Sequence, residues 1–163
     1  AADSGIVVSS LGTLEEFASP DFESIVREFS GLKIIIEHLG GVGPYFGPGR
    51  SNKTLDLDEY RKVLALAKYP NTYMKVPGLG EFCPRPTPFV QPMPFLDVPP
   101  VIEMAIDAFG ARRLMWGSDF PPSANREGYG NALRFPMENV KFKSEEDKEW
   151  VFGKTAMTLW RFS

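Results

Sequence analysis

The residues best suited to chemistry follow short apolar runs of the sequence. The single histidine, His38, and the carboxylate Asp119 each stand just after such a run. A neutral imidazole can bind a metal or transfer a proton near neutral pH, and a carboxylate can bind the same metal or accept a proton from water. His38 and Asp119 are therefore candidates for a metal-ligand or acid–base pair. Equivalent places near the ends of the runs hold Ser9, Ser10, Glu37, Lys75 and Ser118.

Each of these residues also has a purely structural interpretation. A lone histidine at the end of a strand often serves only in packing and hydrogen bonding. A carboxylate followed by a proline pair, as at Asp119, is typical of a turn that hydrogen-bonds its own backbone. Lys75 alternates with the apolar Met74 and Val76, so its side chain faces either a barrel interior or solvent. The functional interpretation requires that the strand ends share one edge of a sheet.

Strands and helices are predicted to alternate along the chain. Apolar and β-branched runs indicate strands at 5–10, 32–37, 72–76 and 113–116. Capping residues and helical spacing indicate helices at 20–30, 56–69, 100–109, 129–135, 144–152 and 154–160, and a glycine-rich loop is expected at 40–50. Such alternation predicts a parallel sheet with right-handed crossovers, and the carboxyl ends of parallel strands share one edge.

Four strand–helix units are compatible with two α/β architectures. A complete (β/α)8 barrel has eight units and typically about 250 residues, whereas this chain has 163. Half of such a barrel and an open, doubly wound parallel sheet both fit the linear pattern. No linker composition suggests a second domain.

Composition and charge exclude several functional classes. The 18 Lys and Arg residues against 21 Asp and Glu residues give a net charge of −3, which argues against a nucleic-acid partner. No apolar run approaches the roughly 20 residues of a membrane span, and the first residues show no signal-peptide pattern. The single cysteine, Cys83, fits a reducing compartment, so a cytoplasmic location is expected. No glycine-rich motif for nucleotide phosphates is present.

A long proline-rich connection follows the third predicted strand. Residues 77–100 contain several prolines interleaved with phenylalanines, together with Glu81, Cys83 and Arg85. A connection longer than about 15 residues in a compact domain is usually the wall or lid of an active site. The alternative is a polyproline segment that docks a partner. Cys83 is predicted to be a small buried residue, because no CxxC motif surrounds it.

Several segments resemble the amidohydrolase-related (amidohydrolase 2) family of TIM-barrel metal-dependent hydrolases. IIEHLG at 35–40, NTYMKVPGL at 71–79 and RLMWGSDFP at 113–121 are similar to the family's fifth, sixth and eighth strand segments, and residues 150–160 resemble its last helix. The resemblance covers essentially the whole chain. It implies the C-terminal half of a (β/α)8 TIM barrel, with residues 1–163 forming one partial barrel domain of four βα units plus C-terminal helices.

The resemblance also implies roles for individual residues. Asp119 corresponds to the family's metal ligand or general base, and His38 to a metal ligand or substrate-binding group. The implied cofactor is a divalent metal, zinc or manganese, although some lactonase members work without one. The family's His-x-His pair is missing from this sequence. The expected substrate-binding residues are Lys75, Glu81, Arg85, Asn125 and Arg126, and Glu127 is expected to help shape the pocket.

The expected activity is hydrolysis of a lactone, ester or amide carbonyl by attack of water on a small-molecule substrate. Because one histidine and one aspartate are too few for a closed metal site, the isolated chain is expected to be inactive. A complementary N-terminal half-barrel chain or a homo-oligomer is the expected partner, with an apolar interface. Two alternatives remain, namely a decarboxylase or hydratase on the same scaffold, and a non-catalytic binding or scaffold subunit.

Overall fold

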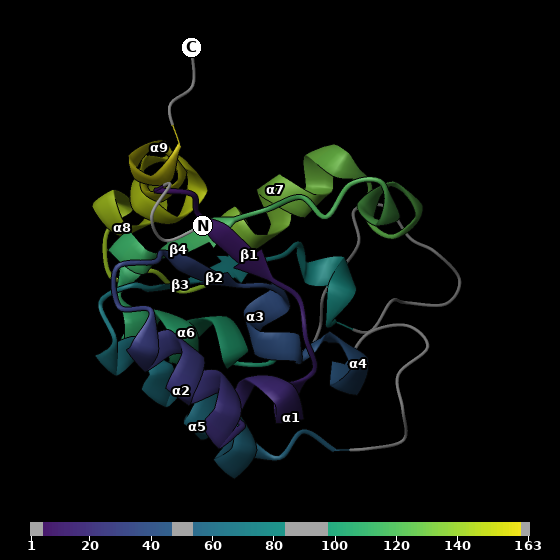
Figure 1. Cartoon of the computed structure of the whole chain (residues 1–163). Helices are drawn as coiled ribbons and strands as arrows, with labels where there is room; N and C mark the ends of the chain where they lie inside the picture. The colour runs from purple at the N-terminus through teal and green to yellow at the C-terminus, as the bar shows by residue number, and fades with distance from the viewer. Residues whose placement is uncertain (1–4, 47–53, 84–97, 161–163) are drawn as a thin grey trace.

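A sheet of four parallel strands forms the centre of the molecule (Figure 1). The computed structural model describes residues 5–46, 54–83 and 98–160. The strands are β1 (Val8–Ser10), β2 (Ile34–Ile36), β3 (Thr72–Val76) and β4 (Leu114–Trp116). All four predicted strands are confirmed, and all but β3 are shorter than predicted. Their short length leaves the polar residues that follow each strand in loops at one edge.

The strands lie side by side in the order in which they occur in the sequence, β1-β2-β3-β4. Ile34 of β2 pairs with Val8 of β1 and Thr72 of β3, and Met74 of β3 pairs with Leu114 of β4. A doubly wound sheet reverses its strand order at a switch point, whereas the strands of a βα barrel follow one another without reversal. The observed order fits half of a barrel and not the doubly wound alternative.

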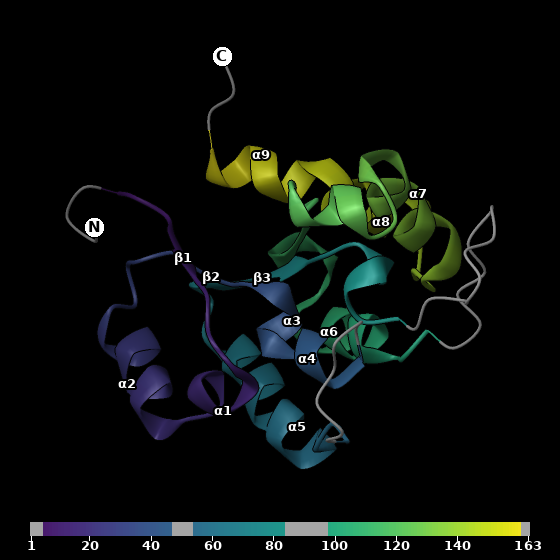
Figure 2. The same cartoon turned by 90° about the vertical axis from the view of Figure 1, so that its right-hand side faces the viewer.

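The helices pack around this sheet in two groups. In Figure 2, α1, α2 and α5 lie below the sheet, and α7, α8 and α9 lie above it. None of the helices in the described residues is long and apolar enough to span a membrane. The helices are α1 (Leu14–Phe17), α2 (Pro20–Glu28), α3 (His38–Gly41), α4 (Gly43–Phe46), α5 (Leu57–Ala65), α6 (Val101–Phe109), α7 (Tyr129–Asn139), α8 (Glu145–Glu149) and α9 (Thr155–Leu159).

Side-chain caps begin helices α2 and α5 at the expected residues. The Ser19 hydroxyl accepts a hydrogen bond from the Phe22 amide at 3.2 Å, directly before Pro20 at the first helical position. The Asp56 carboxylate accepts from the amides of Asp58 and Glu59 at the start of α5. These bonds satisfy amide groups that have no partner inside the helix, so the local sequence fixes where α2 and α5 begin.

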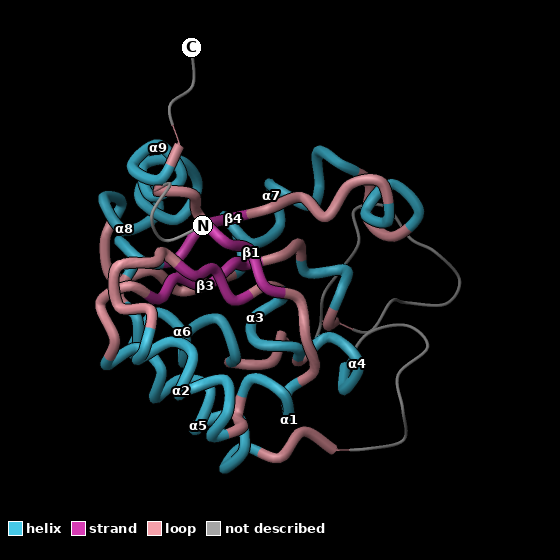
Figure 3. Tube along the Cα trace, viewed as in Figure 1, coloured by secondary structure: helices cyan, strands magenta, loops and turns pink. Residues whose placement is uncertain are grey.

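Three helical predictions need correction. The stretch at 40–50 was expected to be a loop; His38–Gly41 (α3) is a left-handed turn with positive φ angles, whereas Gly43–Phe46 (α4) is a short helix that was not predicted. Helix α1 was not predicted, although its capping box of Thr13 and Glu16 is visible in the sequence. The helices expected at 144–152 and 154–160 form one continuous helix, which passes through a π-helical turn at Trp150–Lys154. Figure 3 shows the strands at the centre, with helices on both sides.

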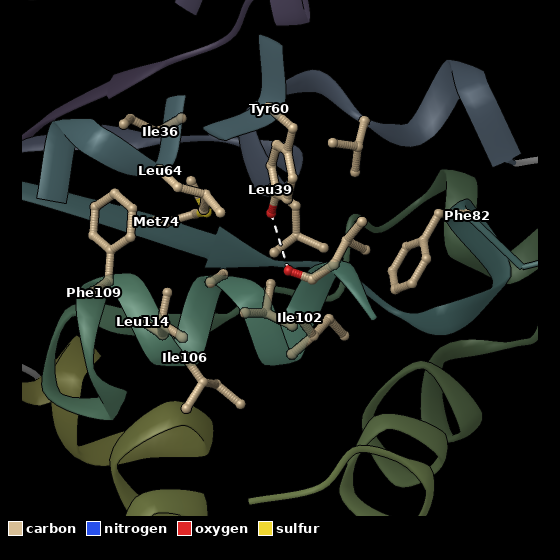
Figure 4. Packing of buried hydrophobic residues seen from close by; sticks show 14 of the residues in the cluster. Ile36, Leu39, Tyr60, Leu64, Met74, Phe82, Ile102, Ile106, Phe109 and Leu114 are labelled. Carbon is tan, nitrogen blue, oxygen red and sulfur yellow. Dashed lines mark hydrogen bonds between the residues drawn. The ribbon is translucent and has the colours of Figure 1, made fainter. Parts of the chain in front are cut away.

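A continuous apolar core joins the sheet to α5 and α6 (Figure 4). Leu114 of β4 and Ile102 of α6 are fully buried within it. Tyr60 of α5 is also fully buried, and its hydroxyl donates a hydrogen bond of 3.0 Å to the carbonyl oxygen of Val101. Burial of one large aliphatic side chain contributes about 1.5–3 kcal/mol to folding, so this layer provides a rigid base for the loops at the strand ends.

Candidate functional site

The ends of all four strands contribute to one pocket of about 570 Å³. Its position agrees with the rule that parallel α/β proteins carry their sites at the carboxyl ends of strands. Two apolar lining residues, Leu11 and Phe120, were not anticipated, and both are exposed at the rim. The lining consists of Ser9, Leu11, Glu37, His38, Lys75, Pro77, Gly117, Ser118, Asp119 and Phe120.

The two residues singled out first, His38 and Asp119, both have left-handed backbone conformations. Their φ angles are +51° and +49°, and Leu39 follows His38 with a φ of +52°. L-residues other than glycine rarely adopt this region, because Cβ approaches the backbone too closely. Strain of this kind persists where the surrounding structure enforces it, and it clusters at functional sites. The turns after β2 and β4 therefore hold these side chains at a cost in local stability.

His38 is held by a carboxylate from a different loop. Its Nδ1 lies 2.8 Å from Oε1 of Glu81, at the end of the short 3-10 helix Leu79–Glu81. Hydrogen bonding to Glu81 raises the pKa of His38, burial opposes that rise, and the carboxylates of Asp119 and Glu37 add to it. A donated Nδ1–H bond leaves Nε2 of the imidazole for a metal or a proton, as in many histidine–carboxylate pairs.

Asp119 is held by Arg126, which follows it by seven residues. Nη2 of Arg126 lies 2.7 Å from Oδ2 of Asp119, and Nη1 lies 4.0 Å from Oε2 of Glu81. The guanidinium also approaches the fully buried carboxylate of Glu127, with Nε 3.6 Å from Oε2. Arg126 therefore lies among three carboxylates and links the loop after β4 to the loop after β3.

A second polar group crosses β1, β2 and β3. Glu37 accepts hydrogen bonds from the Ser9 hydroxyl and from Nζ of Lys75. The Lys75 side chain is 30% exposed, and it lines the pocket. Of the two orientations that the alternation of residues allowed for Lys75, the structure has the one that faces the site.

The other predicted site residues occupy different surroundings. Asn125 is exposed at the end of a short 3-10 helix, Pro122–Asn125, and does not line the pocket. Arg85 lies outside the described residues. Cys83 is buried, and burial raises the pKa of its thiol to about 12, so the thiol is not an activated nucleophile. Arg126 contacts the site by way of Asp119, as described above.

Three side chains have the types and positions needed to hold a divalent cation. One ligand atom each from His38, Glu81 and Asp119 lies within 4.8 Å of the others. A nitrogen with two carboxylate oxygens suits zinc or manganese, and catalytic zinc usually has three protein ligands. Oε2 of Glu81 is buried and has no hydrogen-bond partner among the described residues, as expected of an atom that a cation would satisfy. The donor set therefore fits a metal.

The pairing of Glu81 with His38 was not predicted from the sequence. Glu81 was expected only to be a substrate-binding residue of the long connection. The sequence does show a pair of glycines at 78 and 80 beside this turn, but neither has a positive φ, and both leave room for the Glu127 carboxylate. Which side chain this turn meets depends on the neighbouring loops, and the sequence pattern does not contain that information.

Known proteins share the sequence pattern of this chain. The sequence pattern of the amidohydrolase family matches residues 1–162. The chain is 32% identical over 147 residues to an L-fucono-1,5-lactonase of Burkholderia ambifaria, and the match covers 87% of this chain and 46% of that protein. The chain therefore spans about half the length of the relatives that it matches.

Solved structures share the fold. An amidohydrolase from Burkholderia multivorans with bound zinc gives a TM-score of 0.73 at 20% identity, over 99% of this chain and 55% of that one. Amidohydrolase 2 from Bifidobacterium longum subsp. infantis gives 0.68 at 20% identity, over 99% and 52%. At such identities the likeness concerns the fold alone, and the match to the family pattern decides membership. This chain belongs to the amidohydrolase family.

Proposed function

We propose that this chain supplies the carboxyl-terminal half of the active site of a hydrolase that opens a lactone by attack of water. The observation that carries the proposal is the convergence of His38, Glu81 and Asp119 at the strand ends, beside a pocket. The similarity to an L-fucono-1,5-lactonase favours a sugar lactone over an amide or a simple ester. Hydrolysis joins the water oxygen to the carbonyl carbon, breaks the ring C–O bond and yields a hydroxy acid.

The two principal side chains have complementary roles in this reaction. Asp119 accepts a proton from the attacking water, and the Arg126 guanidinium fixes the direction of its carboxylate. His38 faces the negative charge that develops on the carbonyl oxygen. Nδ1 of His38 bonds to Glu81, so Nε2 is the nitrogen that can stabilise this charge, as a hydrogen-bond donor or through a metal that it would hold. Lys75 lines the same pocket as a cationic contact for the substrate.

A divalent metal, zinc or manganese, is the cofactor that we propose for this site. His38, Glu81 and Asp119 would hold it, and it would supply a Lewis acid next to the substrate carbonyl. The family relationship and the donor set support this assignment.

We further propose that additional strands complete the pocket. Among the described residues, β1 and β4 form the two edges of the sheet. Leu11 and Phe120, which are 76% and 64% exposed, present apolar surface next to these edges. An N-terminal half-barrel chain or a second copy of this chain would cover them, and without this cover we expect no turnover. A native mass spectrum of the purified protein tests this, since a bare 163-residue species that is fully active contradicts it.

The decisive experiment for the reaction is a lactone screen of the assembly in which additional strands complete the pocket, with one matched pair of variants of this chain. We expect Asp119→Asn to lower turnover of the preferred five- or six-membered sugar lactone by at least about 1,000-fold, because it removes the base and leaves the shape of the side chain. Asp107→Asn is the control, since Asp107 is an exposed carboxylate of α6 that does not line the pocket and forms an ion pair with Lys143 at 2.8 Å.

Three results would contradict the proposal. Near-normal turnover in Asp119→Asn would remove the assigned role of Asp119. Carbon dioxide release from unsaturated carboxylic acids, without acid release from any lactone, would favour the decarboxylase alternative. A protein that binds a partner tightly and turns over neither substrate class would favour the binding-subunit alternative.

A further inference from the structure

Arg126 occupies an unusual place for a cation in a candidate metal site. Its guanidinium reaches Asp119 at 2.7 Å and Glu81 at 4.0 Å, and these are the two carboxylates of the proposed donor set. The Arg126 side chain is only 16% exposed. A guanidinium this close to a ligand carboxylate neutralises part of the charge that would otherwise attract a divalent cation.

The loop after β4 is built to return Arg126 to this position. The amide of Ser123 donates to the carbonyl of Asp119 at 3.0 Å, and the amides of Arg126 and Gly128 both donate to the carbonyl of Ser123. Gly128 has a φ of +84° and directly precedes α7. These bonds fold residues 119–128 into a compact turn, so the position of Arg126 does not depend on its long side chain alone.

Glu127 fixes the other side of the guanidinium. Its carboxylate is completely buried and lies against Gly78 and Gly80, where a Cβ atom would approach its oxygens to 2.2 and 1.9 Å. Only glycine at both positions leaves room for this carboxylate. The same backbone continues into Glu81, so Glu127 and Arg126 together join the loops that carry Glu81 and Asp119. A buried carboxylate of this kind requires a nearby cation, and Arg126 is that cation.

The charges around the site support a competition between cations. The carboxylates of Glu37, Glu81, Asp119 and Glu127 face two cationic side chains, Lys75 and Arg126. Lys75 pairs with Glu37 and not with a member of the donor set. The charge balance of Glu81 and Asp119 is therefore set by Arg126, by His38 and by any metal that binds.

We propose that Arg126 is a resident counter-cation, which holds Asp119 and Glu81 in place of a divalent metal and so weakens metal binding by this chain. Because the guanidinium bonds to Oδ2 of Asp119, a metal must either displace it or bind the other oxygen beside a fixed positive charge. The inference rests on the cation-binding part of the proposed function and is independent of lactone hydrolysis. Its test therefore measures zinc affinity and stability, and a failed lactone screen leaves it unaffected.

The test is calorimetric titration of zinc chloride into the chelator-treated protein. We expect Arg126→Gln to lower the Kd for zinc at least tenfold relative to the natural protein. Zinc should also raise the melting temperature of Arg126→Gln more than that of the natural protein, because a ligand that binds the folded protein more tightly stabilises it more. Arg134→Gln removes the same charge from an exposed position of α7 and should leave the Kd within about twofold. Adding Asp119→Asn to Arg126→Gln should abolish the gain.

Zinc binding that does not become tighter in Arg126→Gln would contradict the proposal. If Arg126 serves to orient Asp119 for the metal, Arg126→Gln will bind zinc equally or more weakly, and the proposal is overturned. Loss of the guanidinium beside Glu127 can also unfold the protein, so Arg126→Lys provides a second variant. A lysine keeps the positive charge but cannot contact several carboxylates with one planar group. We therefore expect the Kd of Arg126→Lys for zinc to be at least about threefold lower than that of the natural protein. Unchanged or weaker binding in a folded Arg126→Lys protein overturns the proposal as well.

Discussion

Leu114 and Asp119 are five residues apart in the chain, yet their surroundings differ in every respect. Leu114 lies in β4, is fully buried among aliphatic side chains and has an ordinary extended backbone. Asp119 lies at the edge of the pocket with a positive φ angle and an ion pair to Arg126. The first region is stabilised by burial of apolar surface, and the second is held in a strained, charged arrangement by the loops around it. Stability and chemistry should therefore respond to different substitutions.

The largest effect on stability is expected in the apolar core. Leu114→Ala should lower the free energy of unfolding by about 3 kcal/mol, because it removes buried methyl groups and leaves a cavity between β4 and the helices. Urea denaturation followed by circular dichroism measures this. Leu57→Ala is the matched control, since Leu57 is 44% exposed at the start of α5 and should cost less than about 0.5 kcal/mol. Equal losses in the two variants would show that the core does not carry the stability assigned to it.

At the site, a substitution is expected to lower activity much more than stability. His38→Asn should lower kcat/KM for the preferred lactone by about 100-fold and change the free energy of unfolding by less than about 1 kcal/mol. Asparagine tolerates the φ of +51° at this position, so the substitution removes the imidazole without new backbone strain. His38→Val is the companion variant, and its β-branched side chain should destabilise the turn further. Activity retained in folded His38→Asn would rule out the proposed role of the imidazole.

A smaller effect should appear where the two regions meet. Gly80→Ala places a Cβ atom 1.9 Å from a carboxylate oxygen of Glu127, so the buried carboxylate or the loop must move. We expect a loss of about 2 kcal/mol in the free energy of unfolding, together with lower turnover. In Gly130→Ala, by contrast, the new Cβ meets nothing within 4 Å and lies in α7. That variant should be neutral or slightly stabilising, because alanine has the higher helix propensity. A neutral Gly80→Ala would contradict the close fit of Glu127.

Much of the fold was predictable because its signals are local. The caps at Ser19 and Asp56 and the apolar run of β2 each act over a few residues, and the structure confirms those elements. The alternation of strands and helices predicts a parallel sheet. It also places His38 and Asp119 at the same edge, and the pocket includes both. The short helix at 43–46 and the continuity of the last helix across 150–155 were not predicted, because short helical turns and π-helical turns have weak sequence signals.

The sequence by itself therefore determined which residues end the strands, and with them the chemical types available to the site. Tertiary structure decided which of those residues meet. Glu81 reaches His38 across 43 positions, and Arg126 joins Glu81 to Asp119, because β2, β3 and β4 lie side by side in register. The positive φ angles at His38 and Asp119 likewise depend on loops packed against one another. Contacts between loops depend on distances across the sheet, and no short sequence pattern encodes those distances.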